Sequence, residues 1–209
     1  MTQLMPQSHG SAAHPLCRPA VFLDRDGVIN RDSPDYIKSW SEFEFLPGVL
    51  DALAKLSRRG YGIYVISNQS AVGRGLISQT MLEQIFSNML RVIYSHGGRI
   101  TDVFYCPHRP EEDCPCRKPM PGLVFEACRK YPVDLSKAVM VGDSAKDVAC
   151  ARNAGCRYAV RIAPETAGSS LSEENLPDTE PDFTAPDLSR AADWIIHRFY
   201  SASPAHANT

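Results

Sequence analysis

Two aspartates, one residue apart, end an apolar segment near the start of this chain. Asp24 and Asp26 follow Val21 to Leu23, which is typical of a buried parallel strand, and Gly27 comes next. A strand that ends on charged residues presents them at the carboxyl edge of its sheet, where open α/β folds bind ligands. Two carboxylates this close repel each other unless a cation separates them or one holds a proton. The pair favours a magnesium site with a nucleophile and a general acid, although a solvated strand end and turn has the same local pattern.

Three more polar residues follow predicted strands further along the chain. Ser67, Lys118 and Asp143 come after strands that we expect at residues 61–66, 102–105 and 138–141. Because parallel strands bring their carboxyl ends to one edge, these side chains are expected to converge on the acidic pair. The loop over residues 67–75 contains two glycines and an arginine. It suits the presentation of backbone N–H groups to an anion, or it is an ordinary strand-to-helix turn.

Three cysteines and a histidine lie within one short polar loop. The spacings are Cys106-x-His108 and Cys114-x-Cys116, and this set suits tetrahedral Zn²⁺ in a closed, structural site. Free cysteines are the alternative, and a disulfide between Cys114 and Cys116 is geometrically cramped and unexpected in a reducing compartment. Because Lys118 comes just after the loop, we hypothesise that zinc places this lysine for catalysis.

The elements that must position these residues alternate between strands and helices. Helices are expected after Pro47-Gly48, after the cap residue Ser78, over Gly122 to Lys130, before Gly155 and over Ser189 to Tyr200. The helix after Ser78 is expected to bury a stripe made of Met81, Leu82, Ile85, Met89 and Ile93. With five strands, the last at residues 157–162, this order predicts a three-layer, doubly wound α/β fold with a mostly parallel sheet.

The domain boundaries follow from the same pattern. We expect one domain over residues 19–200, disordered tails over residues 1–18 and 201–209, and a mobile loop over residues 166–182. Residues 30–47 are expected to form an ordered flap over the end of the first strand. The segments between the motifs are too short for a cap domain.

The composition excludes several classes of protein. At 209 residues the chain is long enough for one sizeable domain. Its formal net charge of −2 gives no global positive field for nucleic acid or for an anionic membrane. No apolar stretch approaches the roughly 20 residues that a membrane helix needs. We therefore expect a cytoplasmic monomer without nucleic-acid or membrane partners.

The order of the motifs is an acidic pair, a hydroxyl, a lysine and a further carboxylate. Over residues 21–155 it resembles the haloacid dehalogenase-like (HAD) phosphohydrolase superfamily. The resemblance implies that Asp24 attacks phosphorus to form an aspartyl-phosphate. It implies that Asp26 protonates the leaving oxygen and then activates water, for which it must first hold a proton near neutral pH. Ser67 and Lys118 would bind the transferring phosphoryl oxygens.

The same resemblance implies a catalytic magnesium ion. Mg²⁺ would be held by Asp24, by the backbone carbonyl of Asp26 and by Asp143, which is the hard-oxygen set that this ion prefers. Contact with the ion would also keep the Asp24 carboxylate charged. Asp147, one helical turn beyond Asp143, is expected to orient its neighbours rather than to bind the ion.

The zinc-type loop, followed directly by Arg117 and Lys118, narrows the resemblance to the histidinol-phosphatase-like branch. Within it, residues 22–30, 36–48 and 68–70 look like the family of D-glycero-D-manno-heptose-1,7-bisphosphate 7-phosphatases. The resemblance implies an enzyme that removes the 7-phosphate of this small sugar phosphate during synthesis of the heptose of bacterial lipopolysaccharide or of related nucleotide-activated heptoses. Candidate substrate contacts, beyond the acidic pair, Ser67 and Lys118, are Asp32, Asp35, Asn68, Gln69, Ser70, Arg74 and Arg117.

Two positions depart from the family pattern, and one substrate feature stays open. Many members carry Thr where Ser67 stands, and many carry Lys where Ser144 follows Asp143, a place for which Lys146 is a candidate substitute. The second phosphate of the substrate would be met by Arg117, Arg109 or Arg74, which the sequence does not rank.

Other functions are kept as alternatives. Histidinol-phosphate phosphatase is the nearest, and a polynucleotide 3′-phosphatase is disfavoured by the near-neutral charge. A receiver domain, which is a phosphorylated switch without turnover, also combines acidic residues, a hydroxyl and a lysine at a sheet edge. The zinc-type loop and the position of Asp143 after the lysine argue against a receiver.

Overall fold

Six strands form one parallel sheet in the computed structural model, which describes residues 18–164 and 180–200. The strand order is β3-β2-β1-β4-β5-β6, so the direction of winding reverses between β1 and β4. In an open α/β sheet this switch point is where ligands bind, outside the carboxyl ends of the strands. The strands are β1 (Arg18–Leu23), β2 (Gly62–Asn68), β3 (Asp102–Cys106), β4 (Val133–Gly142), β5 (Tyr158–Ile162) and β6 (Phe183–Ala185).

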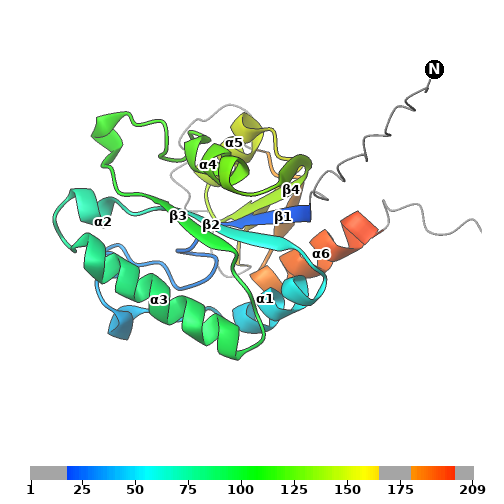
Figure 1. Ribbon diagram of the computed structural model, residues 1–209, viewed down its shortest axis with the longest axis horizontal. Coiled ribbons are helices and arrows are strands. Elements are labelled where there is room, and N and C mark those ends of the chain that lie inside the picture. Colours follow the sequence, from blue (N-terminus) through cyan, green and yellow to red (C-terminus); the bar gives the residue numbers. More distant parts are fainter. Residues whose placement is uncertain (1–17, 165–179, 201–209) are drawn as a thin grey trace, which may run out of the picture.

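Helices cover both faces of the sheet and make three layers (Figure 1). On one face lie α1 (Val49–Arg58), α3 (Gln79–Ser95) and α6 (Leu188–Tyr200). On the other face lie α4 (Gly122–Lys130) and α5 (Ala145–Ala154). The short helices are α2 (Ser70–Gly73) and two 3₁₀ turns, η1 (Trp40–Glu42) and η2 (Pro110–Glu112).

The central strand β1 is buried on both sides because its side chains alternate between the two cores. Val21 and Leu23 pack with the core of α1, α3 and α6, whereas Ala20 and Phe22 pack with that of α4 and α5. Burial on both faces explains why every residue from Ala20 to Leu23 is apolar. Its charged continuation emerges at the carboxyl edge.

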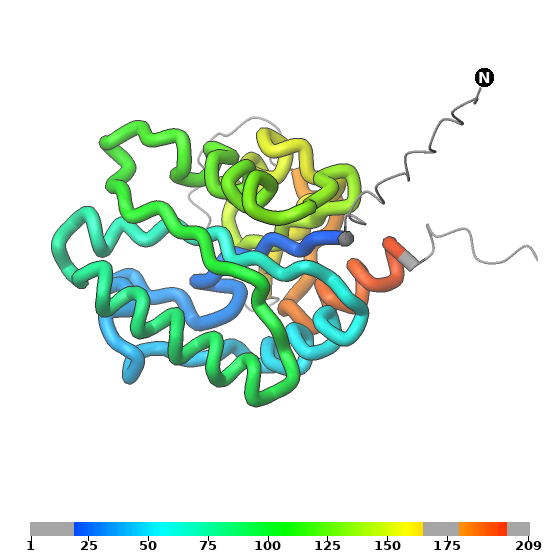
Figure 2. The backbone as a smooth tube through the Cα atoms, viewed as in Figure 1, coloured from blue at the N-terminus to red at the C-terminus, as the bar shows by residue number. Residues whose placement is uncertain are grey.

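The chain between β1 and α1 forms the expected flap. Figure 2 shows it beside α3, which η1 contacts. Asn30 pairs with Phe45 in an isolated antiparallel bridge, and the stacked rings of Trp40 and Phe43, 4.9 Å apart, fill its interior. No separate cap is evident in the described parts of the chain.

Most predicted elements are confirmed, and the differences have local causes. The fully parallel sheet gains β6, whose three residues, only one of them buried, are too few to show a pattern in sequence. Asp182, which was expected in a mobile loop, accepts hydrogen bonds from Ala159 N at 2.7 Å and Arg152 Nη1 at 2.9 Å. Met81 is exposed rather than part of the buried stripe of α3. Arg18 lies in β1, not in a tail, and residues 1–17, 165–179 and 201–209 lie outside the described residues.

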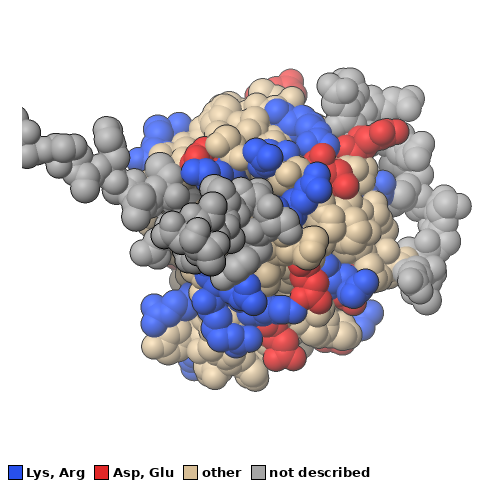
Figure 3. All heavy atoms as spheres, turned by 90° about the vertical axis from the view of Figure 1, so that its right-hand side faces the viewer, with Lys and Arg blue, Asp and Glu red and all other residues tan. Residues whose placement is uncertain are grey.

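The surface away from the carboxyl edge carries both signs of charge. Figure 3 shows the face on the right-hand side of Figure 1, where Lys and Arg side chains lie among Asp and Glu side chains. This mixture agrees with the net charge of −2. Among the described helices, none has the length and apolar character needed to cross a membrane.

Candidate active site

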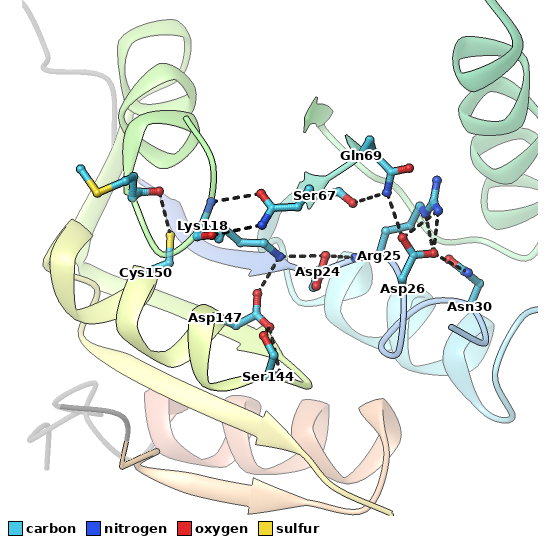
Figure 4. A network of polar contacts seen from close by, with 12 residues as sticks. Asp24, Arg25, Asp26, Asn30, Ser67, Gln69, Lys118, Ser144, Asp147 and Cys150 are labelled. Atoms are coloured by element: carbon cyan, nitrogen blue, oxygen red, sulfur yellow. Dashed lines mark hydrogen bonds and ion pairs between the residues drawn. The ribbon is translucent and has the colours of Figure 1, made fainter. Parts of the chain in front are cut away.

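A buried lysine joins two carboxylates at the switch point of the sheet (Figure 4). Lys118 Nζ lies 2.8 Å from Asp24 Oδ1 and 2.6 Å from Asp147 Oδ1, and only 2% of the lysine side chain is exposed. Asp24 follows β1 directly, Asp147 lies in the first turn of α5, and Lys118 precedes a cis peptide bond to Pro119. The structure thus brings the first strand and the distant lysine together, as the sequence predicts.

Two glycines allow the acidic residues to approach the backbone closely. A Cβ on Gly27, which has φ +75°, would lie 1.9 Å from Asp143 Oδ2. A Cβ on Gly142 would lie 2.1 Å from the Asp147 side chain. Neither contact is possible for real atoms, so both positions require glycine for these carboxylates to stay where they are.

Asp147 is held at the start of α5 by a reciprocal cap. Its Oδ2 accepts hydrogen bonds from Ser144 N at 3.1 Å and Ser144 Oγ at 2.6 Å. This capping box fixes the carboxylate while its other oxygen faces Lys118. The Ser144 side chain is thus part of the cap of α5, and it fixes the position of the Asp147 carboxylate.

Three carboxylates gather around the lysine, and their charges are incompletely balanced. Carboxylate oxygens of Asp24, Asp143 and Asp147 lie within 4.8 Å of one another and could hold a metal ion. Burial raises the pKa of Asp24 to about 8, and Lys118 only partly opposes this. Burial, then the charge of Asp147, raises the pKa of Asp143 to about 7. Burial alone would lower the pKa of Lys118, but Asp147 and Asp24 raise it above its usual value.

The raised pKa of Asp24 is that of the site without an ion, whereas the charged carboxylate was expected in contact with Mg²⁺. The physical reason is the desolvation of an acidic group that shares its surroundings with two more. Asp24 still has a defined orientation, because Oδ1 also accepts a hydrogen bond from Arg25 N at 2.7 Å.

Asp26 lies in a different environment from Asp24. Its carboxylate accepts hydrogen bonds from Arg25 Nη2 at 2.6 and 2.7 Å, from Asn30 Nδ2 at 2.9 Å and from Gln69 Nε2 at 2.9 Å. Figure 4 shows it directed toward Gln69 and Asn30. Each member of the acidic pair therefore has its own cation, Lys118 for one and Arg25 for the other, which resolves the repulsion inferred from their spacing.

The end of β2 supplies a hydroxyl and two amides, all turned inward. Ser67 is fully buried, and its Oγ accepts a hydrogen bond from Gln69 Nε2 at 2.8 Å. Asn68 Oδ1 accepts from Lys118 N at 3.0 Å, while Asn68 Nδ2 donates to Lys118 O at 3.2 Å. Both amides, predicted as substrate contacts, here bind other residues of the site.

Three of the remaining predicted substrate contacts are Ser70, Asp32 and Asp35. Ser70 is buried at the start of α2. Asp32 and Asp35 line a cavity of about 390 Å³ in the flap. A second cavity, of about 410 Å³, adjoins Lys118.

The three candidate arginines are not equivalent in the structure. Arg117 lines the cavity beside the buried lysine. Arg74 Nη2 lies 3.7 Å from Glu111 Oε1, and Arg109 Nε lies 3.5 Å from Glu112 Oε1, both on the surface of the molecule. Of these three arginines, only Arg117 lines the same cavity as Lys118.

The cysteines and histidine converge as predicted. Neighbouring donor atoms of Cys106, His108, Cys114 and Cys116 lie 3.3–3.5 Å apart, with His108 presenting Nδ1. A tetrahedral site with bonds near 2.3 Å has edges of about 3.8 Å, so the set fits a small ion after slight expansion. Against the effect of burial, hydrogen bonds from Cys116 and Cys106 lower the pKa of Cys114 to about 7. Thiolates are the form that binds metal.

The sequence resemblance placed Arg25 only within a stretch of substrate contacts, residues 24–26, and gave Asn30 no role. Arg25 is 1% exposed and pairs with Asp26, and its guanidinium lies 5.7 Å from the ring centre of Phe86 on α3. The available signal was the placement of an arginine between two aspartates, and of an asparagine four residues after the second. Neither spacing reveals that both side chains are buried.

The fold and this site define a phosphatase of the HAD-like hydrolase class. A family model described as HAD-hydrolase-like matches residues 115–191. The chain is 42% identical over 176 residues to the D-glycero-beta-D-manno-heptose-1,7-bisphosphate 7-phosphatase of Bordetella bronchiseptica, over 84% of this chain and 97% of the relative. It is 40% identical over 142 residues to the enzyme of the same name from Pseudomonas aeruginosa, over 68% of this chain and 80% of that relative.

A solved structure agrees with these sequence matches. The D,D-heptose 1,7-bisphosphate phosphatase of B. bronchiseptica, complexed with magnesium and phosphate, superposes with a TM-score of 0.77 at 36% identity, over 86% of this chain and 98% of that one. This chain therefore belongs to the HAD-like hydrolases and is a homologue of the heptose-1,7-bisphosphate 7-phosphatases.

Proposed function

We propose that this enzyme removes the 7-phosphate of D-glycero-β-D-manno-heptose 1,7-bisphosphate through an aspartyl-phosphate, with Mg²⁺ as its catalytic ion. The observation that carries the proposal is the buried Lys118 between Asp24 and Asp147 at the switch point of the sheet. Phosphoryl transfer requires positioning and charge stabilisation more than covalent chemistry. The identity with phosphatases of this sugar bisphosphate over most of their length supports the substrate.

The reaction has two balanced steps. A carboxylate oxygen of Asp24 forms a bond to phosphorus while the bond between phosphorus and the sugar oxygen breaks, and Asp26 gives its proton to that oxygen. Asp26 then takes a proton from water, the water oxygen bonds to phosphorus, and the bond to Asp24 breaks to release phosphate. The Lys118 ammonium and the Ser67 hydroxyl stabilise the phosphoryl oxygens in both steps.

The carboxylates around Lys118 fit Mg²⁺. With Asp24, Asp143 and Asp147 ionised, the three negative charges face one lysine, so a divalent cation would bring the group to neutrality. Asp24 and Asp143 would hold the ion, together with the carbonyl of Asp26. When bound, Mg²⁺ supplies charge neutralisation for the phosphoryl group and favours the ionised form of its ligands.

We also propose that Cys106, His108, Cys114 and Cys116 hold a structural Zn²⁺. The four donors come from the end of β3 and the loop after it, and they lie within tetrahedral reach. The loop leads directly into Arg117 and Lys118, so a fixed loop would fix both cations. The unpaired thiols of the described residues agree with a cytoplasmic location.

The second phosphate of the substrate is assigned to Arg117 and Lys146. Both line the cavity of about 410 Å³ that Lys118 also lines. Lys146 lies at the start of α5, two residues after Ser144, whose hydroxyl is engaged by Asp147. Lys146 would thus supply the cation that many relatives place at position 144.

Steady-state kinetics with Mg²⁺ test the proposed function. We expect kcat/KM for the heptose bisphosphate to exceed that for histidinol phosphate by at least about 10²-fold, because the latter lacks a second anion for Arg117 and Lys146. Phosphorus NMR of the product should still show the signal of the sugar 1-phosphate. A strong preference for histidinol phosphate, or release of the 1-phosphate, would overturn the assignment. A single turnover followed by a stable phosphoprotein would indicate a switch instead of an enzyme.

A further inference from the structure

Gln69 stands out among the predicted substrate contacts because its amide is committed to two catalytic side chains. It is 4% exposed, and its Nε2 lies 2.8 Å from Ser67 Oγ and 2.9 Å from Asp26 Oδ2. An amide nitrogen carries two hydrogens, so these two bonds use both. The opposite amide orientation would place a carbonyl oxygen against the Asp26 carboxylate, which is repulsive.

The hydrogen bond to Ser67 determines which way the hydroxyl hydrogen can point. A hydroxyl offers one hydrogen and two lone pairs. The hydrogen bond from Gln69 Nε2 occupies one lone pair of Ser67 Oγ. The amide hydrogen also repels the hydroxyl hydrogen of Ser67, which therefore points away from Gln69. Within the described chain Gln69 is the side-chain partner of this hydroxyl. The hydrogen is therefore left to donate to a phosphoryl oxygen.

The backbone of Gln69 is also fixed, and from the side of the cysteine loop. Gln69 N donates to Cys106 O at 2.7 Å, and Gly73 N, one turn further along, donates to Pro107 O at 3.0 Å. Asn68 beside it holds the backbone of Lys118. Gln69 is thus held at both its main chain and its side chain, as a positioning group requires.

We propose that Gln69 is a positioning residue that couples the two halves of the reaction: one amide nitrogen directs the Ser67 hydroxyl toward the phosphoryl group and holds the Asp26 carboxylate in place for proton transfer. This inference rests on the proposed phosphatase function, but not on the identity of the sugar. It replaces the expectation that Gln69 contacts the substrate.

Two substitutions separate this role from substrate binding. Gln69→Glu presents a carboxylate that accepts the Ser67 hydrogen and repels Asp26, and we expect kcat to fall by about 10²-fold. Gln69→Met keeps the length of the side chain without its donors, and we expect a loss of about tenfold. KM should change by less than about threefold for both variants, since only transition-state contacts are weakened. Gln79→Met, an exposed glutamine of α3 bonded to Glu83, is the matched control and should leave kcat unchanged.

The kinetics are measured with the heptose bisphosphate and with p-nitrophenyl phosphate, which has no sugar. A positioning role predicts similar losses of kcat for both esters. An increase of KM for the bisphosphate alone, at unchanged kcat, would overturn the proposal in favour of a sugar contact. If the wild type hydrolyses only the aryl ester, the sugar assignment fails and the comparison of Gln69 variants still holds.

A double-mutant cycle with Ser67→Ala tests the coupling itself. If Gln69 acts through this hydroxyl, Gln69→Met should cost clearly less in kcat when Ser67 is already alanine. Fully multiplicative effects, with equal thermal stability of the variants, would contradict the coupling. Gln69→Met carries the test if Gln69→Glu does not fold, because methionine is readily buried at this position.

Discussion

The two clusters that could hold metal ions are assembled in opposite ways. The carboxylates come from the end of β1, from the end of β4 and from α5, and they meet because Leu23 pairs with Val141 in the central strands. Cys106 is the last residue of β3, and the other thiols and the imidazole come from the loop between β3 and α4. The first cluster therefore depends on the order of the central strands, whereas the second needs only that this loop folds back onto the end of one strand.

They also differ in what holds them without an ion. The carboxylate cluster contains its own cation, Lys118, which is almost fully buried and bridges Asp24 and Asp147. The Cys-His cluster contains no cation of its own: its side-chain donors contact one another, Cys106 is buried and the other three are partly exposed. The carboxylate cluster is therefore preorganised by the fold, whereas we expect the loop that leads into Lys118 to depend on a metal ion.

The largest expected effect tests the carboxylate cluster directly. Asp24→Asn should lower kcat by about 10⁴-fold or more, because an amide cannot act as the nucleophile. The folded state should survive, and without metal its Tm at neutral pH should rise by a few degrees. Burial raises the pKa of Asp24 to about 8, so folding at neutral pH must protonate this carboxyl, and asparagine does not carry that cost. Phosphate release and thermal unfolding in EDTA measure the two results. Retained turnover would remove Asp24 from its role.

Loss of the central cation should affect both catalysis and stability. Lys118→Met leaves Asp24 and Asp147 facing each other in a buried site, so we expect a cost of about 3–5 kcal/mol in the free energy of unfolding and a fall of about 10²–10³-fold in kcat. Urea unfolding and steady-state kinetics check this. Lys130→Met is the control: its ammonium pairs with Asp102 on the surface, with 60% of the lysine side chain exposed, so the substitution should leave the free energy of unfolding nearly unchanged. Equal costs would mean that the cluster is not preorganised.

Removing a loop ligand should produce an intermediate effect. We expect Cys116→Ser to lose the bound zinc and to lower kcat by about 10–100-fold, because Lys118 is no longer held in place. Elemental analysis of the purified protein gives the zinc content, and Mg²⁺ titration of the residual activity should show little change in Mg²⁺ affinity. Cys128→Ser on α4, outside the loop, should keep both zinc and activity. A zinc-free wild-type protein with full activity would show that the loop does not need an ion.

The two clusters were not equally predictable from sequence. The loop donors could be identified because short spacing already places them together, and the structure confirms their convergence. The positions of Asp24 and Lys118 followed from strand ends in an alternating α/β pattern. The contact between Lys118 and Asp147 could not be predicted, because it depends on strand order and on the capping box with Ser144.

Side-chain direction was the other limit of the sequence. Asn68 and Gln69 follow a strand beside an anion site, which suggests substrate contacts, yet in the structure both amides turn inward to other residues of the site. Their direction is set by partners that are 43 and 50 residues away along the chain. Nothing in the local spacing carries this information.

The smallest expected effect concerns the link between the two clusters. Asn68 holds the backbone of Lys118 through a donor and an acceptor, at 3.2 and 3.0 Å, while the cysteine loop holds it from the preceding residues. Because these supports act in parallel, Asn68→Ala should lower kcat by about tenfold with KM nearly unchanged. Asn68→Asp keeps the acceptor for Lys118 N and should recover part of the loss. In the zinc-free Cys116→Ser protein, Asn68→Ala should cost more than in the wild type, since the second support is gone. A rise in KM at constant kcat would instead indicate that Asn68 contacts the substrate. Its two hydrogen bonds would then not be needed to hold Lys118 in place.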